Sequence, residues 1–395
     1  MIVAIQTFLF WALTLLSFPA WSETPLRGLR VDPAYFSSLY PEMNAQQIAN
    51  LVVNEAATAG ATALFLYAYS SLHGSFYLTS YPLTEIEEPM GSENIFSLVY
   101  TAARSRGLKV IAVIPINDFK LVWQEHPGWR SKLSNGEDYK PFVRTHHLSA
   151  WHPEFRLWLK GFVTDLLNKF PGLYAIEVVE PTVDCFWTGA PDYNPAANAA
   201  FKKKFPKGKL GDENWRKIRA LGMTELIASV ARTAHAHNIR AAVVQTWPSG
   251  YDGKLLTSDQ VRDQVGFDFD GALNLKGPEK IDILTGEFLW QQWAAEYGGE
   301  VFTPAWTQKA AHDFVSFVRN RSTPIIHVEI SPWYGQTTTV NPTIEEFKDT
   351  LKSINNMGLG IDVYDHSQIE GRQAWSALGN WIRTERPTEN TKAAE

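Results

Sequence analysis

Tyr174-Ala-Ile-Glu-Val-Val-Glu180-Pro-Thr-Val-Asp184 is the stretch of this 395-residue sequence that decides the fold. Its first six residues, 174–179, form an apolar run of strand length, and two carboxylates, Glu180 and Asp184, stand at and beyond its end. A helix-like segment, 152–170, precedes the run, with Pro153 at a first helical position, where proline loses no hydrogen bond. In parallel α/β proteins the chemistry lies at the carboxyl ends of the strands. The stretch therefore predicts the floor and the lip of an active site.

Strand-like and helix-like segments alternate along most of the chain. The runs of strand length are 29–31, 63–67, 109–114, 174–179, 240–245, 267–273, 324–328 and 359–363. The segments with helical spacing of apolar residues are 44–60, 92–106, 152–170, 213–237, 280–297, 307–319, 343–357 and 373–383. Eight such units without a break in composition predict a single (β/α)8 TIM barrel, an α/β fold, over residues 23–385. A doubly wound sheet is the main alternative, but Asp32-Pro33 takes the place of a Gly-rich phosphate loop after the first strand.

The two ends of the chain differ from the rest. An apolar run, 9–19, precedes Ala20-Trp21-Ser22, which is a small-x-small cleavage sequence. Residues 1–22 are therefore predicted to be a signal peptide of a periplasmic or secreted protein, and an uncleaved anchor is the alternative. No other apolar run is long enough to span a bilayer, so we expect no stable membrane insertion after cleavage. The polar tail, 386–395, is expected to be disordered.

Composition excludes several classes of protein. A net charge of -6 and a pI near 6.0 give no general attraction to nucleic acids. The single cysteine, Cys185, excludes an intrachain disulfide and a cysteine-based metal cluster. We expect neither a cofactor nor a metal ion. The 15 Trp and 14 Tyr are a high aromatic content, and flat rings on loops suit stacking against sugars.

Carboxylates and aromatic rings collect at the expected strand exits. The residues there are Asp32, Asp118, Glu180, Asp184, Trp247, Glu329, Trp333, Tyr364, Asp365 and His366. In a barrel these residues converge on one face. Glycoside hydrolysis needs such a set: one carboxylic acid protonates the leaving oxygen, and a second carboxylate acts as nucleophile or base.

The positions of Glu180 after the fourth strand and Glu329 after the seventh resemble the glycoside hydrolases of clan A. A more extended segment is similar to the family-10-like glycosyl hydrolases. It consists of Ser149-Ala-Trp-His-Pro-Glu-Phe-Arg-Leu-Trp-Leu, the strand that ends at Glu180, and Tyr193-Asn-Pro-Ala-Ala-Asn-Ala-Ala-Phe201. The likeness covers roughly residues 145–205.

These resemblances imply roles for the residues at the strand exits. Glu180 would be the general acid/base, with a pKa raised by apolar neighbours such as Val178 and Val179, and Glu329 would be the nucleophile. The carbohydrate substrate would be bound by Asp32, Asp118, Asp184, Trp247, Trp333, Tyr364 and Asp365. The implied protein is an exported glycosidase that acts on a polysaccharide or an oligosaccharide.

The sequence departs from both families at one position. Clan A usually has Asn before the strand-four Glu, and the family-10-like proteins usually end this strand with two Asp, whereas this chain has Val179-Glu180. Either the catalytic role shifts to Asp184, or the site has lost activity. Glu177 lies inside the same strand, where a buried charge needs a partner, and a structural or subsite role is expected for it.

The sequence is compatible with two other functions. Val179 favours a non-catalytic carbohydrate-binding barrel, such as an accessory factor in exopolysaccharide assembly. The cluster of His146, His147 and Asp118 raises the alternative of a metal-dependent hydrolase. Two facing carboxylates in an open cleft would favour the glycosidase over the binding protein.

Overall fold

The computed structural model describes residues 24–84, 90, 93–140, 145–184, 191–330 and 342–382. The predicted signal peptide, Cys185, Trp333 and the tail 386–395 lie outside the described residues. Within the described ranges, no helix combines the length and the apolar character that crossing a bilayer requires.

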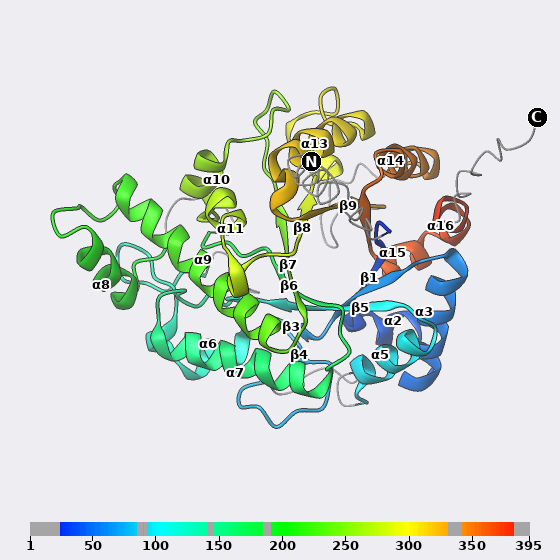
Figure 1. Cartoon of the computed structure of the whole chain (residues 1–395), viewed down its shortest axis with the longest axis horizontal. Coiled ribbons are helices and arrows are strands. Elements are labelled where there is room, and N and C mark those ends of the chain that lie inside the picture. The colour runs from blue at the N-terminus through cyan, green and yellow to red at the C-terminus, as the bar shows by residue number, and fades with distance from the viewer. Residues whose placement is uncertain are drawn as a thin grey trace, which may run out of the picture.

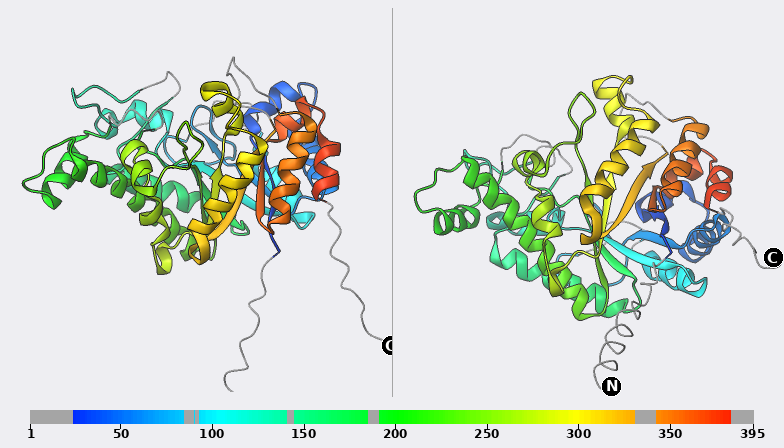
Figure 2. Two further views of the ribbon diagram at one scale, coloured as in Figure 1. Left: turned by 90° about the horizontal axis from the view of Figure 1, so that it is seen from above. Right: turned by 45° about the horizontal axis from the view of Figure 1, so that its top comes forward.

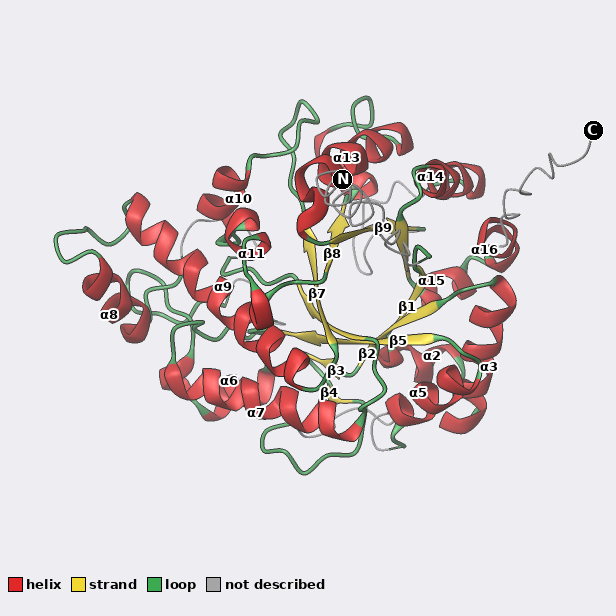
Figure 3. Ribbon diagram, viewed as in Figure 1, coloured by secondary structure: helices red, strands yellow, loops and turns green. Residues whose placement is uncertain are grey.

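Eight parallel strands close into a barrel at the centre of the molecule (Figure 3). They are β1 (Arg27–Val31), β2 (Ala63–Tyr67), β5 (Lys109–Pro115), β6 (Ala175–Val179), β7 (Arg240–Thr246), β8 (Ile283–Glu287), β9 (Thr323–Glu329) and β10 (Gly360–Tyr364). Their order around the barrel is β1-β10-β9-β8-β7-β6-β5-β2, and β2 pairs with β1 to close it. The predicted (β/α)8 barrel is thereby confirmed.

Helices surround the barrel and occupy the connections between its strands (Figure 1). They are α2 (Phe36–Leu39), α3 (Ala45–Ala59), α5 (Ile95–Ser105), α6 (Lys120–Glu125), α7 (Pro153–Lys169), α8 (Pro195–Lys204), α9 (Glu213–Ala236), α10 (Ser258–Val265), α11 (Phe269–Leu273), α12 (Trp290–Tyr297), α13 (Pro304–Val318), α14 (Ile344–Asn356), α15 (His366–Gly371) and α16 (Trp375–Ile382). The 3-10 helices are η1 (Pro33–Tyr35), η2 (Pro127–Trp129), η3 (Gly277–Glu279) and η4 (Arg319–Arg321), and a small hairpin consists of β3 (Tyr69–Ser70) and β4 (Gly74–Ser75).

Capping residues explain several helix boundaries. Asn44 forms a capping box with Gln47 at the start of α3, and Gly60, with a φ of 86°, ends that helix in the left-handed conformation. Asn194 accepts a hydrogen bond from the backbone N–H of Ala196 and so caps the start of α8, where Pro195 is the first helical residue.

The sixth strand lies at a different place from the one predicted. Residues 267–273 were expected to form it, but they contain helix α11, which Asp268 caps by accepting a hydrogen bond from the N–H of Gly271 (2.9 Å). The true sixth strand, β8, lies inside the segment 280–297 that was predicted to be helical. Its sequence, Ile-Leu-Thr-Gly-Glu, has only two strongly apolar residues. Pairing with β7 on one side and β9 on the other therefore decides its structure.

The interior of the barrel changes from apolar to charged along its axis. Near the amino ends of the strands an apolar cluster fills it, formed by Leu26, Ala63, Phe65, Ile111, Val113, Ala175, Ala242, Ile283 and Ile325. Alternate residues of a strand share a face, so the next inward positions lie two residues further along. Those positions carry the buried polar residues Arg30, Glu177, Thr285, His327 and Asp362.

Helix α8 and the first turns of α9 lie at the opposite end of the molecule from α16 (Figure 2). They have a small core of their own, in which Phe201, Trp215 and Ile218 are buried. Tyr193 stacks on Trp215 with ring centroids 4.4 Å apart. The part of the family-10-like segment that follows Tyr193 therefore belongs to this outer cluster and not to the barrel.

Candidate active site

Three glutamates stand at strand exits around the mouth of the barrel. Glu180 directly follows β6, Glu287 is the last residue of β8, and Glu329 is the last residue of β9. Thr246, the last residue of β7, lies opposite Glu287 in the strand register. All four side chains come from the carboxyl ends of strands, where (β/α)8 barrels carry their active sites.

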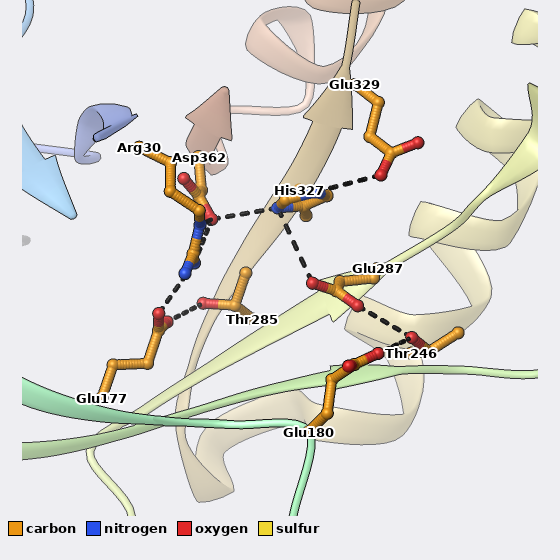
Figure 4. A network of polar contacts seen from close by, with 9 residues as sticks. All are labelled: Arg30, Glu177, Glu180, Thr246, Thr285, Glu287, His327, Glu329 and Asp362. Atoms are coloured by element: carbon orange, nitrogen blue, oxygen red, sulfur yellow. Dashed lines mark hydrogen bonds and ion pairs between the residues drawn. The ribbon is translucent and has the colours of Figure 1, made fainter. Parts of the chain in front are cut away.

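A chain of polar contacts connects the three glutamates (Figure 4). The hydroxyl oxygen of Thr246 lies 3.0 Å from Oε1 of Glu180 and 2.8 Å from Oε2 of Glu287. His327 Nδ1 lies 4.0 Å from Oε1 of Glu287, and its Nε2 lies 3.7 Å from Oε1 of Glu329. The structure thus places Glu180 and Glu329 in one network, linked through three intervening side chains.

A second set of polar residues supports this network from below. The Arg30 guanidinium donates to Glu177 Oε2 (2.7 Å) and, through Nε, to Asp362 Oδ2 (3.0 Å). Asp362 Oδ2 also lies 3.0 Å from His327 Nδ1, and the Thr285 hydroxyl donates to Glu177 (3.1 Å). Arg30 is therefore the partner that the buried charge of Glu177 requires.

Burial and neighbouring charges shift the pKa values of these groups. Burial alone would lower the pKa of His327, but the surrounding carboxylates, with Glu287 and Asp362 foremost, outweigh it and raise that pKa to about 10. Burial and the charge of Glu180 raise the pKa of Glu287 to about 7. Burial also raises the pKa of Glu180, whereas Arg30 and His327 overcome the effect of burial on Asp362 and lower its pKa. At neutral pH His327 is thus a cation and Asp362 an anion.

The backbone at Glu180 turns its side chain toward the network. Glu177 and Val179 face the interior, so a regular strand would direct residue 180 outward. Glu180 instead has a φ of 39°, in the left-handed region that residues other than glycine rarely adopt. Its side chain is exposed to solvent, although protein surrounds the carboxyl closely enough for desolvation to raise its pKa.

Three predicted substrate-binding residues lie at strand exits next to this network. Asp32 follows β1 and accepts a hydrogen bond from the N–H of Ala34 (2.9 Å). The ring of Tyr364, at the end of β10, lies 5.4 Å from that of His327. Asp365 is buried and caps α15 by accepting a hydrogen bond from the N–H of Gln368.

Asp118 follows the third barrel strand, β5, and lies beside the pair His146-His147. It accepts a hydrogen bond from the N–H of His146 (2.8 Å), and burial raises its pKa to about 7. The Nδ1 atom of His146 is 3.8 Å from Asp118. Among the described residues, no three His, Cys, Asp or Glu side chains are grouped so that they could hold a metal ion.

Two further predicted binding residues are packed inside the protein. Trp247 is 4% exposed, stacks on Phe269 with ring centroids 4.4 Å apart, and donates its indole N–H to the Leu256 carbonyl. Asp184 is fully buried and accepts a hydrogen bond from the Tyr139 hydroxyl (2.6 Å). A role for either in binding sugar stays a prediction, as does that of Trp333, which lies outside the described residues.

Sequence reasoning missed Glu287 because it assigned the surrounding segment to a helix. It also gave no role to Thr246 or Arg30. The sequence of β9 did contain a signal that His327 belongs to the site. His327 and Glu329 are two residues apart, so their side chains face the same side of the strand.

Comparison with solved structures places this barrel among those of glycoside hydrolases. The glycoside hydrolase domain of PgaB (BpsB) from Bordetella bronchiseptica is similar with a TM-score of 0.68 and 12% identity, covering 92% of this chain and 100% of that one. A β-galactosidase from the psychrophilic Marinomonas ef1 has a TM-score of 0.62 and 12% identity, covering 86% of this chain and 54% of that one. A β-galactosidase from the Antarctic haloarchaeon Halorubrum lacusprofundi has a TM-score of 0.63 and 9% identity, covering 90% of this chain and 57% of that one.

These similarities are similarities of fold. No family model matches the sequence, and no curated protein matches it either. The chain spans the whole of the PgaB domain and slightly more than half of each β-galactosidase. It is thus a glycosyl hydrolase-like (β/α)8 barrel, consistent with the resemblance to clan A.

Proposed function

We propose that this protein is a glycoside hydrolase that cleaves glycosidic bonds in a polysaccharide or oligosaccharide, with Glu180 and Glu329 as its two catalytic carboxyl groups. One observation carries the proposal. Glu180 and Glu329 come from strands β6 and β9, far apart in the sequence, and they belong to one polar network at the barrel mouth. The fold shared with glycoside hydrolases supports it.

The environments of the two glutamates favour different roles. Glu180 is reachable by solvent, and burial of its carboxyl group raises its pKa, which favours the protonated form that gives a proton to the leaving oxygen. Glu329 forms an ion pair with the His327 imidazolium at 3.7 Å, which suits a carboxylate that attacks the anomeric carbon. Both the proton and the negative charge that glycoside hydrolysis requires are thereby supplied by this chain.

Side chains around the mouth are suited to holding the sugar. Asp32 offers a carboxylate oxygen to sugar hydroxyls, and Tyr364 offers a ring beside the network, whereas a binding role for the fully buried Asp365 stays a prediction. Tyr251, in the connection after β7, and Tyr297, in α12 after β8, are 77% and 42% exposed, and their ring centroids lie 4.6 Å apart. Exposed rings at the carboxyl end of the barrel provide flat surfaces for a sugar chain.

A second candidate function is a carbohydrate-binding barrel without catalytic activity, such as an accessory factor in exopolysaccharide assembly. Val179 favours it, because this residue packs on the apolar interior cluster and offers Glu180 no polar neighbour where clan A has Asn. In both cases the signal peptide predicted in residues 1–22 leads us to propose a periplasmic or secreted protein.

Release of reducing ends from a panel of soluble polysaccharides tests the proposal. Glu180→Gln and Glu329→Gln should each lower the rate by about 100-fold or more, because each removes a proton donor or a nucleophile. Glu225→Gln is the matched control and should keep the wild-type rate, because this half-buried glutamate of α9 pairs with Arg156 of α7, outside the network.

The variants also separate the two candidate functions. Affinity electrophoresis in gels that contain the same polysaccharides measures binding without catalysis, and Glu180→Gln should still be retarded. Full activity in both Gln variants would exclude the assignment of the two glutamates. Retardation of the wild-type protein without any release of reducing ends would favour the binding barrel.

A further inference from the structure

The hydroxyl of Thr246 contacts two carboxyl groups but carries a single hydrogen. Its oxygen lies 3.0 Å from Glu180 and 2.8 Å from Glu287, and both distances are those of hydrogen bonds. A hydroxyl group can donate only one of these bonds. In the other it must accept, and a carboxyl group donates only when it is protonated. The geometry therefore fits a pair of carboxyl groups that holds one proton.

The charges around the pair also favour a proton on it. The charged and titratable groups that face it from the surrounding strands are Arg30, Tyr67, Glu177, His327, Glu329 and Asp362. Arg30 is engaged by Glu177 and Asp362, and His327 is shared among Asp362, Glu287 and Glu329. The mouth thus contains two cations and five carboxyl groups, which are the pair itself and Glu177, Glu329 and Asp362. If all five carboxyl groups were ionised, the mouth would carry a net negative charge. Two carboxyl groups that share a site titrate as a unit, and one of them keeps its proton to higher pH.

We propose that Glu180 and Glu287 hold one proton between them through the hydroxyl of Thr246, so that Glu287 sets the protonation state of the acid. The proposal rests on the proposed function, in which Glu180 is the general acid. Glu287 acts through Glu180 and is a positioning residue for its proton. Neither Glu287 nor Thr246 was among the residues expected from the sequence.

The proton follows a balanced path in this arrangement. In the resting state Glu180 donates to the Thr246 oxygen, and Thr246 donates to the Glu287 carboxylate. The reverse arrangement is reached when both protons shift along the hydroxyl. When Glu180 gives its proton to the glycosidic oxygen, the Glu329 carboxylate forms a bond to the anomeric carbon, the bond from that carbon to the glycosidic oxygen breaks, and its electron pair stays on the oxygen. Glu180 and Glu287 are then both ionised until water displaces Glu329 from the anomeric carbon and gives a proton to Glu180.

The pH profile of kcat/KM on the hydrolysed polysaccharide tests the pair. Glu287→Gln removes the negative neighbour of Glu180, so the pKa of Glu180 falls and the high-pH limb moves down by about one unit or more. Activity on the acid side of the limb should remain. Thr246→Val removes a hydroxyl that stabilises the ionised carboxyl groups, so the limb should move up.

Thr285→Val is the matched control, because its hydroxyl contacts Glu177 in the deeper set of polar residues. This variant should leave the limb where it is. A uniform loss of activity at every pH in Glu287→Gln and Thr246→Val, without movement of the limb, would overturn the inference. Thermal unfolding of each variant shows that it is folded.

A spectroscopic measurement separates this inference from the proposed function. The infrared carbonyl stretch of protonated carboxylic acids, compared at neutral pH between wild type and Glu287→Gln, reports the shared proton without any substrate. Loss of that band in Glu287→Gln supports the pair even if the protein hydrolyses no polysaccharide. Identical bands in the two proteins would refute it even if the protein is an active glycosidase.

Discussion

The two halves of the barrel interior are built from opposite chemistry. Around the amino ends of the strands, Phe65, Ile111, Ile283 and Ile325 pack as part of one apolar cluster. Thr285 and His327 lie two residues beyond Ile283 and Ile325, and together with Arg30, Glu177 and Asp362 from other strands they form a charged and polar region that is almost completely buried. The apolar half follows the usual rule for stable interiors, whereas the charged half departs from it.

The difference shows which half stabilises the fold and which half serves a site. Burying apolar side chains contributes roughly 1.5–3 kcal/mol for each large residue. Buried ion pairs, in contrast, are often no more stabilising than apolar residues of similar volume. A barrel under selection for stability alone would extend its apolar cluster, so the charged half indicates chemistry.

Removing the central cation of the charged half should have the largest effect on stability. Arg30→Met leaves Glu177 without its ion-pair partner and also removes the ion pair between Arg30 and Asp362. The free energy of unfolding should fall by about 3–5 kcal/mol, measured by urea denaturation. Arg232→Met, which breaks an exposed pair with Glu279, should cost about 1 kcal/mol or less. Equal losses in the two variants would contradict the distinction between the buried and the exposed pair.

Stability should also decrease as the pH rises, in two steps. The pKa of Glu287 is raised to about 7 in the folded state, so the folded protein binds more protons than the unfolded chain as the pH rises toward 7. The pKa of His327 is raised to about 10, so its contribution is complete below its ordinary value of about 6.5 and is lost as the pH approaches 10.

Urea denaturation at intervals from pH 5 to pH 10 measures both steps. His327→Gln should flatten the upper step and move the lower one to higher pH, because the His327 cation lowers the pKa of Glu287. A stability that stays constant or rises between about pH 7 and pH 10 in the wild-type protein would contradict the ion pairs around this imidazole.

A small change in the apolar half should have the smallest effect. Ile283→Val removes one methyl group from the interior cluster and should lower the free energy of unfolding by about 0.5–1.5 kcal/mol. Because Ile283 lies two residues below Thr285 on β8, the pH profile of hydrolysis should stay unchanged. A shifted profile would mean that the two halves are coupled more tightly than their contacts indicate.

Seven of the eight strands could be predicted because apolar residues make up most of each run and the runs alternate with helix-like segments. The strand β8 could not, because Thr285, Gly286 and Glu287 interrupt its apolar pattern and only its two neighbours make it a strand. This one error hid Glu287, since a strand that is not recognised has no exit at which to look for a carboxylate.

The alternation of side chains explains which predicted exit residues joined the network. Thr246 faces inward, so Trp247, the next residue, faces the helices and packs on Phe269. Glu180 would also have faced outward, and only its left-handed backbone directs it to Thr246. A local conformation of this kind follows from the completed fold and not from apolar periodicity, so the inward direction of Glu180 could not be derived from the sequence pattern.

The sharing of one imidazole among three strands has a consequence for how such a protein adapts. His327 contacts carboxyl groups on β8, β9 and β10, and its Nδ1 lies closer to Asp362 than to Glu287. A substitution at Asp362, two residues before the exit of β10, would leave Nδ1 to Glu287 alone and strengthen that ion pair. Natural variation at the barrel wall can therefore retune the acidity range in which the mouth operates, while every group that meets a ligand stays in place.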